Sequence, residues 1–248
     1  MTNETTPSVV ALIPARAGST RVLDKNVREL AGHPLMAYTI SAALQSGVFE
    51  SVIVSTDSES YAGLARKYGA EVPFLRPAEY AGSVSPDIEW VEYTLNRLGD
   101  EGRNYDCFSI LRPTSPFRHG ETIRRAWKQF LGDQGVDSLR AVEKCQQHPG
   151  KMWVVNGNRM TPLLPMGPVE QPWHSSQYQS LPEVYVQDAS LEIAWSRVVH
   201  DQRTIAGKVL MPFFPEGNEG FDINNEYDWS LAEHLVNSGE AVLPTVTK

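Results

Sequence analysis

The chain has 248 residues and a formal net charge of −8, with 41% hydrophobic and 21% charged residues. This is the composition of an ordinary globular protein, and it excludes a disordered chain, a coiled coil and a collagen-like repeat. The acidic balance argues against broad electrostatic binding to nucleic acid or a membrane surface, so an anionic ligand needs a local cluster of cations.

Two cysteines, Cys107 and Cys145, are too few for a disulfide framework in a chain of this length. The polar residues 1–7 lack the basic start and apolar stretch of a secretory signal. No run approaches the roughly 20 apolar residues that span a membrane. We therefore expect a soluble cytoplasmic protein.

The first half of the chain alternates apolar runs with amphipathic ones, which is typical of β–α–β units on a mostly parallel sheet. The expected strands are 9–13, 52–54, 71–75 and 107–111. The expected helices are 34–46, 58–68, 86–98 and 119–131.

Prolines interrupt the sequence after Ser138 and exclude a long helix there. The elements expected beyond this point are strands at 152–155, 184–195 and 209–212 and a closing helix at 226–237. We interpret 140–195 as an arm or flap inserted in a single domain, 1–248, and as a common place for a dimer contact.

A cluster of cations follows the first expected strand. Within ten residues stand three cations, a glycine and two hydroxyl side chains: Arg16, Arg21, Lys25, Gly18, Ser19 and Thr20. Open α/β folds bind ligands at the carboxyl ends of strands, and backbone N–H groups with cations suit a polyphosphate. A solvated surface loop is the alternative. GxGxxG, GxxxxGK[ST], HExxH and GxSxG are absent, which disfavours dehydrogenases, P-loop NTPases, zincins and serine hydrolases.

Segment 111–118 carries prolines on both sides of Thr114 and Ser115. The prolines stiffen a turn that either holds hydroxyl groups against a ligand or simply connects a strand to a helix.

Segment 221–228 offers Asp222 to Mg²⁺, an ion that prefers one or two carboxylates with water and phosphate oxygens. Asn225 followed by Asp228 is also the pattern of a helix N-cap. Both interpretations can hold, because Asp222 is not needed for the cap.

Five segments in this order resemble the acylneuraminate cytidylyltransferase family, the CMP-sialic acid synthetases, with the CMP-Kdo synthetases as relatives. The segments are Ile13-Pro-Ala-Arg…Lys25-Asn26, Val54-Ser-Thr-Asp57, Arg76-Pro-Ala-Glu79, Leu111-Arg-Pro-Thr-Ser-Pro-Phe-Arg118 and Phe221-Asp-Ile-Asn224. The resemblance implies an α/β, Rossmann-like nucleotidyltransferase fold, a three-layer sandwich with a mostly parallel mixed sheet and a small inserted dimerisation arm. It also implies Mg²⁺-dependent transfer of CMP from CTP to a nonulosonate or related keto sugar acid, with release of pyrophosphate.

The resemblance also implies residue roles. Around the nucleotide it places Ala15, Arg16, Ser19, Lys25, Asn26, Ser83 and Lys151. At the acceptor we expect Arg112, Thr114, Ser115, Asp188 and Glu192. The catalytic set is Arg16, Lys25 and Asp222, and the metal site is Asp222 with Asn224.

The chain departs from the family pattern at the acceptor and at the metal. Arg112 stands where the family has Gln, and 188–192 reads Asp-Ala-Ser-Leu-Glu instead of Asn-Gly-Ala-Ile-Tyr. Asn224 replaces a metal-binding Asp. Asp188 and Glu192 face the same side of a strand, and we hypothesise that Arg112 pairs with one of them. The alternative is that Arg112 binds the carboxylate of the acceptor in a bidentate manner.

Two other functions remain open. CMP transfer to a small non-sugar acid such as a phosphonate fits the altered acceptor residues. A nucleotide-binding protein without catalysis fits the loss of a carboxylate at Asn224. The expected partners are CTP and a small acidic acceptor, in a homodimer, with no nucleic acid and no membrane.

Overall fold

The computed structural model describes residues 6–247, which divide into two compact units. The first unit takes in the chain up to Ala141 and again from Asp188 onward, and the second is Val142–Gln187. The second unit is narrower than the arm expected at 140–195. Strand β9 (Tyr185–Trp195) accounts for the difference, because most of it belongs to the sheet of the first unit.

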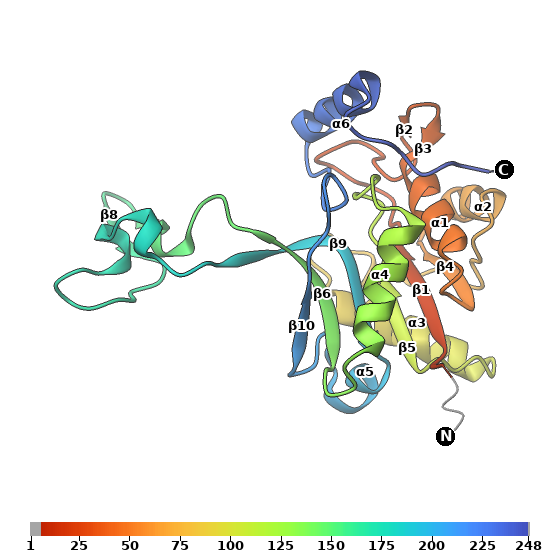
Figure 1. Cartoon of the computed structure of the whole chain (residues 1–248). Coiled ribbons are helices and arrows are strands. Elements are labelled where there is room, and N and C mark those ends of the chain that lie inside the picture. The colour runs from red at the N-terminus through yellow and green to blue at the C-terminus, as the bar shows by residue number, and fades with distance from the viewer. Residues whose placement is uncertain (1–5, 248) are drawn as a thin grey trace. The chain divides into compact units, whose positions relative to one another are not determined.

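A six-stranded sheet in the order β10-β6-β9-β5-β1-β4 is the centre of the first unit (Figure 1). Its other strands are β1 (Val9–Pro14), β4 (Ser51–Ser55), β5 (Cys107–Ile110), β6 (Ser138–Lys144) and β10 (Leu210–Phe213). Strand β1 runs parallel to β4 and β5, and β10 runs parallel to β6. Strand β9 is antiparallel to β5, with Glu192 opposite Ile110. The sheet is therefore mixed and mostly parallel, as expected.

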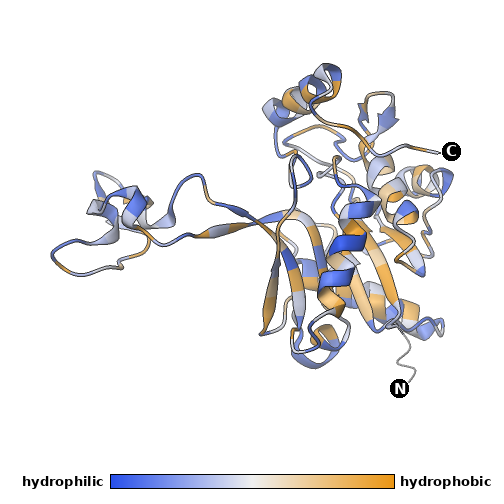
Figure 2. Cartoon of the chain, in the orientation of Figure 1, coloured by the Kyte–Doolittle hydropathy of each residue, from blue (hydrophilic) through white to orange (hydrophobic). Residues whose placement is uncertain are grey.

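Helices cover both faces of this sheet. These helices are α1 (Leu35–Ser46), α2 (Glu59–Lys67), α3 (Asp87–Asp100), α4 (Gly120–Leu131) and α5 (Arg197–Gln202), whereas α6 (Glu226–Ser238) packs beside α1 in a separate cluster. Alternate residues of β1 point to opposite faces: Ala11 and Ile13 pack with α1, α2 and α4, while Val10 and Leu12 pack with α3 and α5. The expected three-layer sandwich is confirmed, and its central strands are among the most hydrophobic parts of the chain (Figure 2).

Most expected elements are present within two residues of their expected ends, but the strand expected at 71–75 is wrong. Only Glu71 forms a bridge, to Ile53 of β4. Pro73 follows two residues later and has no N–H to continue the ladder. Strand β6 and helix α5 are elements that the sequence pattern did not predict.

The second unit contains a hairpin of β7 (Trp153–Asn156) and β8 (Arg159–Pro162). A two-stranded ribbon of β2 (Glu29–Leu30) and β3 (His33–Pro34) precedes α1 in the first unit. Short 3-10 turns occur at Ala78–Tyr80, Pro149–Lys151, Trp173–Ser175 and Tyr178–Ser180. Within residues 6–247, every helix is too short or too polar to cross a lipid bilayer.

Candidate active site

A cavity of about 330 Å³ opens in the first unit, where β1 and β5 reach their carboxyl ends. Ligands bind at this edge of open α/β sheets. The wall is formed by the loops after β1 and β5, by α3 and the segment before it, and by the segment before α6. The lining residues are Pro14, Arg16, Ser19, Thr20, Arg21, Val22, Lys25, Asn26, Arg76, Tyr80, Gly82, Ser83, Ser85, Asp87, Trp90, Arg112, Pro113, Thr114, Ala189, Asp222 and Asn224.

Side chains hold the cationic loop after β1 in place. Asp57 Oδ1 accepts a hydrogen bond from the Ala17 N–H at 2.8 Å, and Asn26 Nδ2 donates to the Arg16 carbonyl at 3.2 Å. Gly18 has a φ of +72°, a conformation that favours glycine. The loop is thus a fixed part of the cavity wall, because the first contact ties it to the segment after β4 and the second joins its two ends.

The expected nucleotide residues divide into three groups. The cavity is lined by Arg16, Ser19, Lys25, Asn26 and Ser83. Ala15 is fully buried and does not line it. Lys151 lies in the second unit, where its Nζ donates hydrogen bonds to the carbonyls of His174 and Ser176.

Lys25 reaches the segment before α6. Its Nζ donates a hydrogen bond to the Ile223 carbonyl at 2.6 Å. Burial is the main factor that lowers the pKa of Lys25; the charge of Asp222 opposes this, and the charges of Arg21 and Arg16 add to it. An ammonium group has three donors, so two remain for a bound anion.

Asp222 has one bonded and one unbonded carboxylate oxygen. Asn224 Nδ2 donates to Asp222 Oδ2 at 2.6 Å. The other oxygen, Oδ1, is buried and has no hydrogen-bond partner within residues 6–247. A buried carboxylate oxygen without a partner is costly, and a divalent cation would satisfy it. Asp222 therefore fits Mg²⁺, although no group of three His, Cys, Asp or Glu side chains occurs in the described part of the chain.

The first turn of α6 fixes this segment. Asn225 Oδ1 accepts hydrogen bonds from the N–H groups of Tyr227 at 2.8 Å and Asp228 at 3.1 Å. In return, Asp228 Oδ2 accepts from the N–H groups of Asn224 and Asn225 at 2.8 and 3.1 Å. The expected N-cap is confirmed, and it leaves Asp222 available to the cavity.

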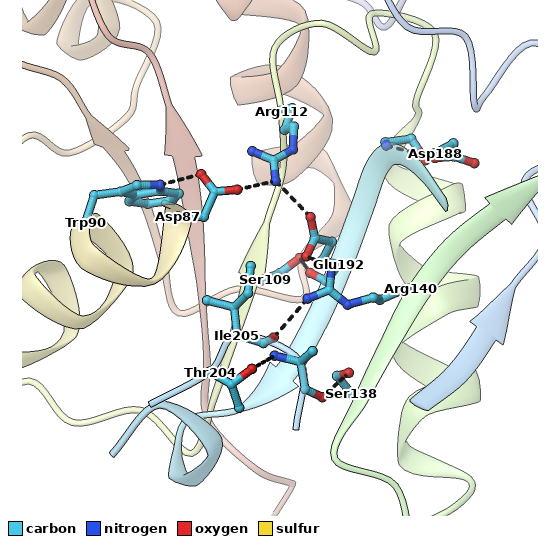
Figure 3. A network of polar contacts seen from close by, with 12 residues as sticks. Asp87, Trp90, Ser109, Arg112, Ser138, Arg140, Asp188, Glu192, Thr204 and Ile205 are labelled. Atoms are coloured by element: carbon cyan, nitrogen blue, oxygen red, sulfur yellow. Dashed lines mark hydrogen bonds and ion pairs between the residues drawn. The ribbon is translucent and has the colours of Figure 1, made fainter. Parts of the chain in front are cut away.

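Arg112 lies between two carboxylates (Figure 3). Its Nη2 donates to Asp87 Oδ2 at 2.7 Å and to Glu192 Oε1 at 2.9 Å. The second oxygen of Glu192 lies 2.5 Å from Arg140 Nη1. The hypothesis that Arg112 pairs with Glu192 or Asp188 is thus confirmed for Glu192, and Asp87 is an additional partner from α3.

Asp87 is the acidic residue through which α3 enters this network. Burial alone would raise the pKa of Asp87, but the charge of Arg112 and hydrogen bonds from Arg112 and Trp90 outweigh it, so the pKa lies below its usual value. The Trp90 indole N–H donates to Asp87 Oδ1 at 2.8 Å. Asp87 is therefore held ionised between α3 and Arg112.

Arg76 forms the wall next to Trp90. Its guanidinium lies 4.7 Å from the Trp90 ring centroid and donates to Ser55 Oγ and to the Ser55 carbonyl, both at 3.0 Å. Burial lowers the pKa of Arg76 to about 10. Arg76 belongs to one of the five resembling segments, but Asp87 and Trp90 carried no signal beyond the start of an amphipathic helix.

The loop after β5 is fastened to the segment before α6. The Ile223 N–H donates to the Thr114 carbonyl at 2.9 Å, and Thr114 lines the cavity. Ser115, expected at the acceptor, is buried and does not line it. Fully buried Arg118 supports the loop through a hydrogen bond from Nη2 to Thr39 Oγ1 at 2.9 Å.

The two expected acceptor carboxylates on β9, Asp188 and Glu192, are not among the lining residues. Glu192 reaches the cavity through Arg112, and Asp188 is the neighbour of Ala189, which lines it. Asp188 Oδ1 accepts a hydrogen bond from the Ser190 N–H at 2.8 Å. Burial raises the pKa of Asp188, although the hydrogen bonds from Ser190 oppose this.

Comparisons with known proteins were made by sequence and by structure. The sequence model of a family described as "Cytidylyltransferase" matches residues 10–140. The chain is 34% identical to a CMP-N,N'-diacetyllegionaminic acid synthase of Legionella pneumophila, over 95% of this chain and 99% of that protein. It is 45% identical to an N-acylneuraminate cytidylyltransferase of Escherichia coli, over 49% of this chain and 28% of that protein.

Solved structures of low sequence identity share the fold. A CMP:2-keto-3-deoxy-manno-octonic acid synthetase complexed with CTP matches with a TM-score of 0.67 at 13% identity, over 94% of this chain and 99% of the other. A 4-diphosphocytidyl-2C-methyl-D-erythritol synthase of Anaerococcus prevotii matches with a TM-score of 0.64 at 10% identity, over 93% and 99%. At these identities, the likeness describes the arrangement of the elements only.

Proposed function

Because this chain belongs to the cytidylyltransferase family, we propose that it transfers CMP from CTP to a nonulosonate, a nine-carbon keto sugar acid, and releases pyrophosphate. The observation that carries the proposal is the convergence of a cationic loop, Arg112 and Asp222 in one cavity. The chain's likeness to the legionaminic acid synthase over nearly its full length supports an acceptor of this class.

The triphosphate is assigned to the loop after β1. Arg16, Arg21 and Lys25 line the cavity there and supply positive charge that the chain as a whole lacks. In the reaction, a hydroxyl oxygen of the acceptor attacks the α-phosphorus and gives up its proton to water. The bond from that phosphorus to the bridging oxygen breaks, and pyrophosphate leaves with its electron pair. The three cations stabilise the charge that develops on the phosphate oxygens and on the leaving group.

Mg²⁺ is the proposed cofactor, and Asp222 is the residue that would hold it. The unbonded Oδ1 of Asp222 supports this assignment. When bound, Mg²⁺ supplies positive charge to phosphate oxygens and lowers the pKa of a hydroxyl that it contacts. Asn224 holds the other oxygen of Asp222 and so fixes the orientation of the carboxylate.

Arg112 is the proposed contact for the acceptor's carboxylate. Its Nη2 donates hydrogen bonds to Asp87 and Glu192, whereas Nε and Nη1 donate none within residues 6–247. Two anchoring carboxylates fix the guanidinium plane, and the remaining N–H groups match a carboxylate in a bidentate geometry.

The test is pyrophosphate release by the purified chain with CTP and Mg²⁺ across a panel of acceptors. The panel contains N-acetylneuraminate, legionaminate, pseudaminate, Kdo and phosphonoformate, and UTP replaces CTP in a parallel series. We expect turnover with at least one nonulosonate and formation of the matching CMP conjugate, and its loss in Lys25→Ala.

Two results would contradict the proposal. Turnover with phosphonoformate and none of the sugar acids would identify a small non-sugar acceptor. CTP binding with no pyrophosphate release from any acceptor would identify a nucleotide-binding protein without catalysis.

A homodimer formed through the second unit is also proposed. In the β7–β8 hairpin, Val155 is 65% exposed, Met160 opposite it is 57% exposed and Val154 is 44% exposed. Water-exposed apolar side chains concentrated on one small hairpin are typical of an interaction surface. A second copy of the chain is the occupant that we assign to it.

A further inference from the structure

Asp188 has a second carboxylate oxygen that no described residue satisfies. The side chain is 6% exposed, and only Oδ1 is bonded, to the Ser190 N–H. Oδ2 is buried and has no hydrogen-bond partner within residues 6–247. A carboxylate buried in this way is strongly unfavourable unless a partner compensates it.

The unsatisfied side of Asp188 lies against the segment that carries Asp222. A Cβ atom built on Gly220 would stand 3.0 Å from Asp188 Oδ2, so the carboxylate abuts the backbone two residues before Asp222. The charge of Asp222 is felt at Asp188, where it adds to burial in raising the pKa. Two carboxylates on adjoining segments thus each have one buried oxygen without a hydrogen-bond partner in the described part of the chain.

The nearest cations do not resolve this arrangement. Arg118 acts electrostatically on Asp188, but its guanidinium donates to the carbonyls of Ser190 and Arg112 and to Thr39 Oγ1. Lys25 donates to the Ile223 carbonyl. Within residues 6–247, neither cation forms an ion pair with Asp188 or Asp222.

We propose that Asp188 is the second carboxylate ligand of the divalent cation held by Asp222. The inference rests on the proposed Mg²⁺-dependent function and deepens it. Mg²⁺ prefers one or two carboxylates together with water and phosphate oxygens, which is the donor set that Asp188, Asp222 and a bound triphosphate supply together. Asp188, on β9, thereby takes the place of the carboxylate that the resembled pattern has at position 224. Asn224 instead positions Asp222.

A metal ion shared by Asp188 and Asp222 explains both departures from the resembled pattern, Asn224 and Asp188. With Asn224, the Asp222 side chain gains a hydrogen-bond donor but the site loses a negative charge. With Asp188, a buried strand position gains a negative charge that is otherwise unfavourable. A metal ion between the two segments makes both changes compatible with a stable fold.

The test is direct binding of Mn²⁺, a spectroscopic substitute for Mg²⁺, followed by the electron paramagnetic resonance signal of the free ion. Titrations are made on the full chain with and without CTP, so that the readout does not depend on turnover. The variants are Asp188→Asn, Asp222→Asn and the double exchange Asp188→Asn with Asn224→Asp. Ser196→Ala is the matched control, because Ser196 directly follows β9 and its hydroxyl is also buried.

We expect Asp188→Asn to weaken Mn²⁺ binding by at least about tenfold, and the double exchange to recover most of that loss. Ser196→Ala should bind as the parent chain does. Circular dichroism and urea unfolding confirm that each variant is folded at the temperature of the titration.

The inference is overturned if Asp188→Asn binds Mn²⁺ as tightly as the parent, as it would if the two carboxylates shared a proton instead of a metal ion. It is also overturned if the double exchange binds no better than Asp188→Asn alone, or if the parent chain binds no Mn²⁺ with or without CTP. Failure of the proposed function is a separate result, since it would appear as absent pyrophosphate release in a chain that still binds Mn²⁺ through Asp188.

Discussion

Arg112 owes its orientation to two acidic side chains that come from different elements. Asp87 begins α3, and Glu192 lies in the part of β9 that pairs with β5. Since both carboxylates meet a single guanidinium nitrogen, the plane of the group is fixed before any ligand arrives. Such pre-organisation reduces the entropy that binding must overcome.

Substitution of Arg112 should affect the acceptor and leave CTP nearly untouched. We expect Arg112→Gln to raise the KM for the acceptor by about 10-fold or more, which is the loss of a charge-assisted hydrogen bond. The KM for CTP should change by less than about twofold. Arg112→Lys keeps the positive charge but loses the bidentate geometry of the guanidinium. Its KM for the acceptor should therefore lie between those of the parent and of Arg112→Gln. Equal effects on both substrates in steady-state kinetics would refute the assignment.

The ionised state of Asp87 makes a pH-dependent contribution to stability. Its pKa in the folded chain lies below the usual value of about 3.9, mainly because Arg112 outweighs burial. Its interactions therefore stabilise the fold fully above that usual value, and they are lost as the pH falls through the folded pKa. We expect Asp87→Asn to lower the urea midpoint clearly at pH 7, with a smaller difference from the parent near pH 3. A difference independent of pH would contradict this account.

Among single residues, the sequence identified most of the cavity wall but not its acidic partners. Arg16, Lys25 and Asp222 stand in short segments with several functional groups each, so their pattern was visible. Asp87 and Trp90 were hidden because an acidic first turn and an aromatic residue are normal features of an amphipathic helix. Their role depends on Arg112, which is distant in sequence and reaches them only in the folded chain.

At the level of elements, α6 stabilises the segment that carries Asp222. Asn225 caps its first turn, and the turn in return holds the N–H groups of Asn224 and Asn225. We expect Asn225→Ala to lower the free energy of unfolding by about 1 kcal/mol, whereas Asn225→Asp retains the cap and the stability. Urea unfolding measures both variants. Equal destabilisation by the two would show that the cap is not the cause.

Strand and helix periodicity predicted the layers of the first unit correctly. The two strands on which it failed, the one expected at 71–75 and β6, have physical explanations. Proline at position 73 prevents the expected strand from continuing. Strand β6 was missed because its alternation includes Arg140, which is 8% exposed and is accepted on the buried face only because Glu192 pairs with it. No local pattern reveals a pairing between residues that are more than fifty positions apart.

For the whole molecule, net charge and local charge have opposite signs. The chain carries −8 overall, while Arg16, Arg21, Lys25, Arg76 and Arg112 all line one cavity. The composition correctly indicated that an anionic ligand needs a local set of cations. It contained no information on where these cations meet, because that depends on the order of the strands.

The proposed assembly gives a prediction for the molecule as a whole. Light scattering after size exclusion should give about twice the chain mass of 27.6 kDa. Val155→Glu combined with Met160→Glu should shift the mass to that of a single chain, since charges on an apolar contact cost several kcal/mol. Asn158→Glu, in the exposed turn between β7 and β8, is the control for charge alone. A monomeric parent, or a dimer that survives the double substitution, would contradict the proposed interface.

Strand β9 gives the fold a route by which its specificity can diverge. Asp188, Ser190 and Glu192 occupy alternate positions on one face of a single strand, and all three are buried. In a strand, the backbone hydrogen bonds hold the sheet whatever the side chains are, so each of these positions can mutate without a change of topology. Moving along the strand by four residues, from Glu192 to Asp188, shifts the affected point from Arg112 to the segment of Asp222. A small combinatorial library at these three codons would therefore sample new acceptors and new metal requirements on an unchanged scaffold.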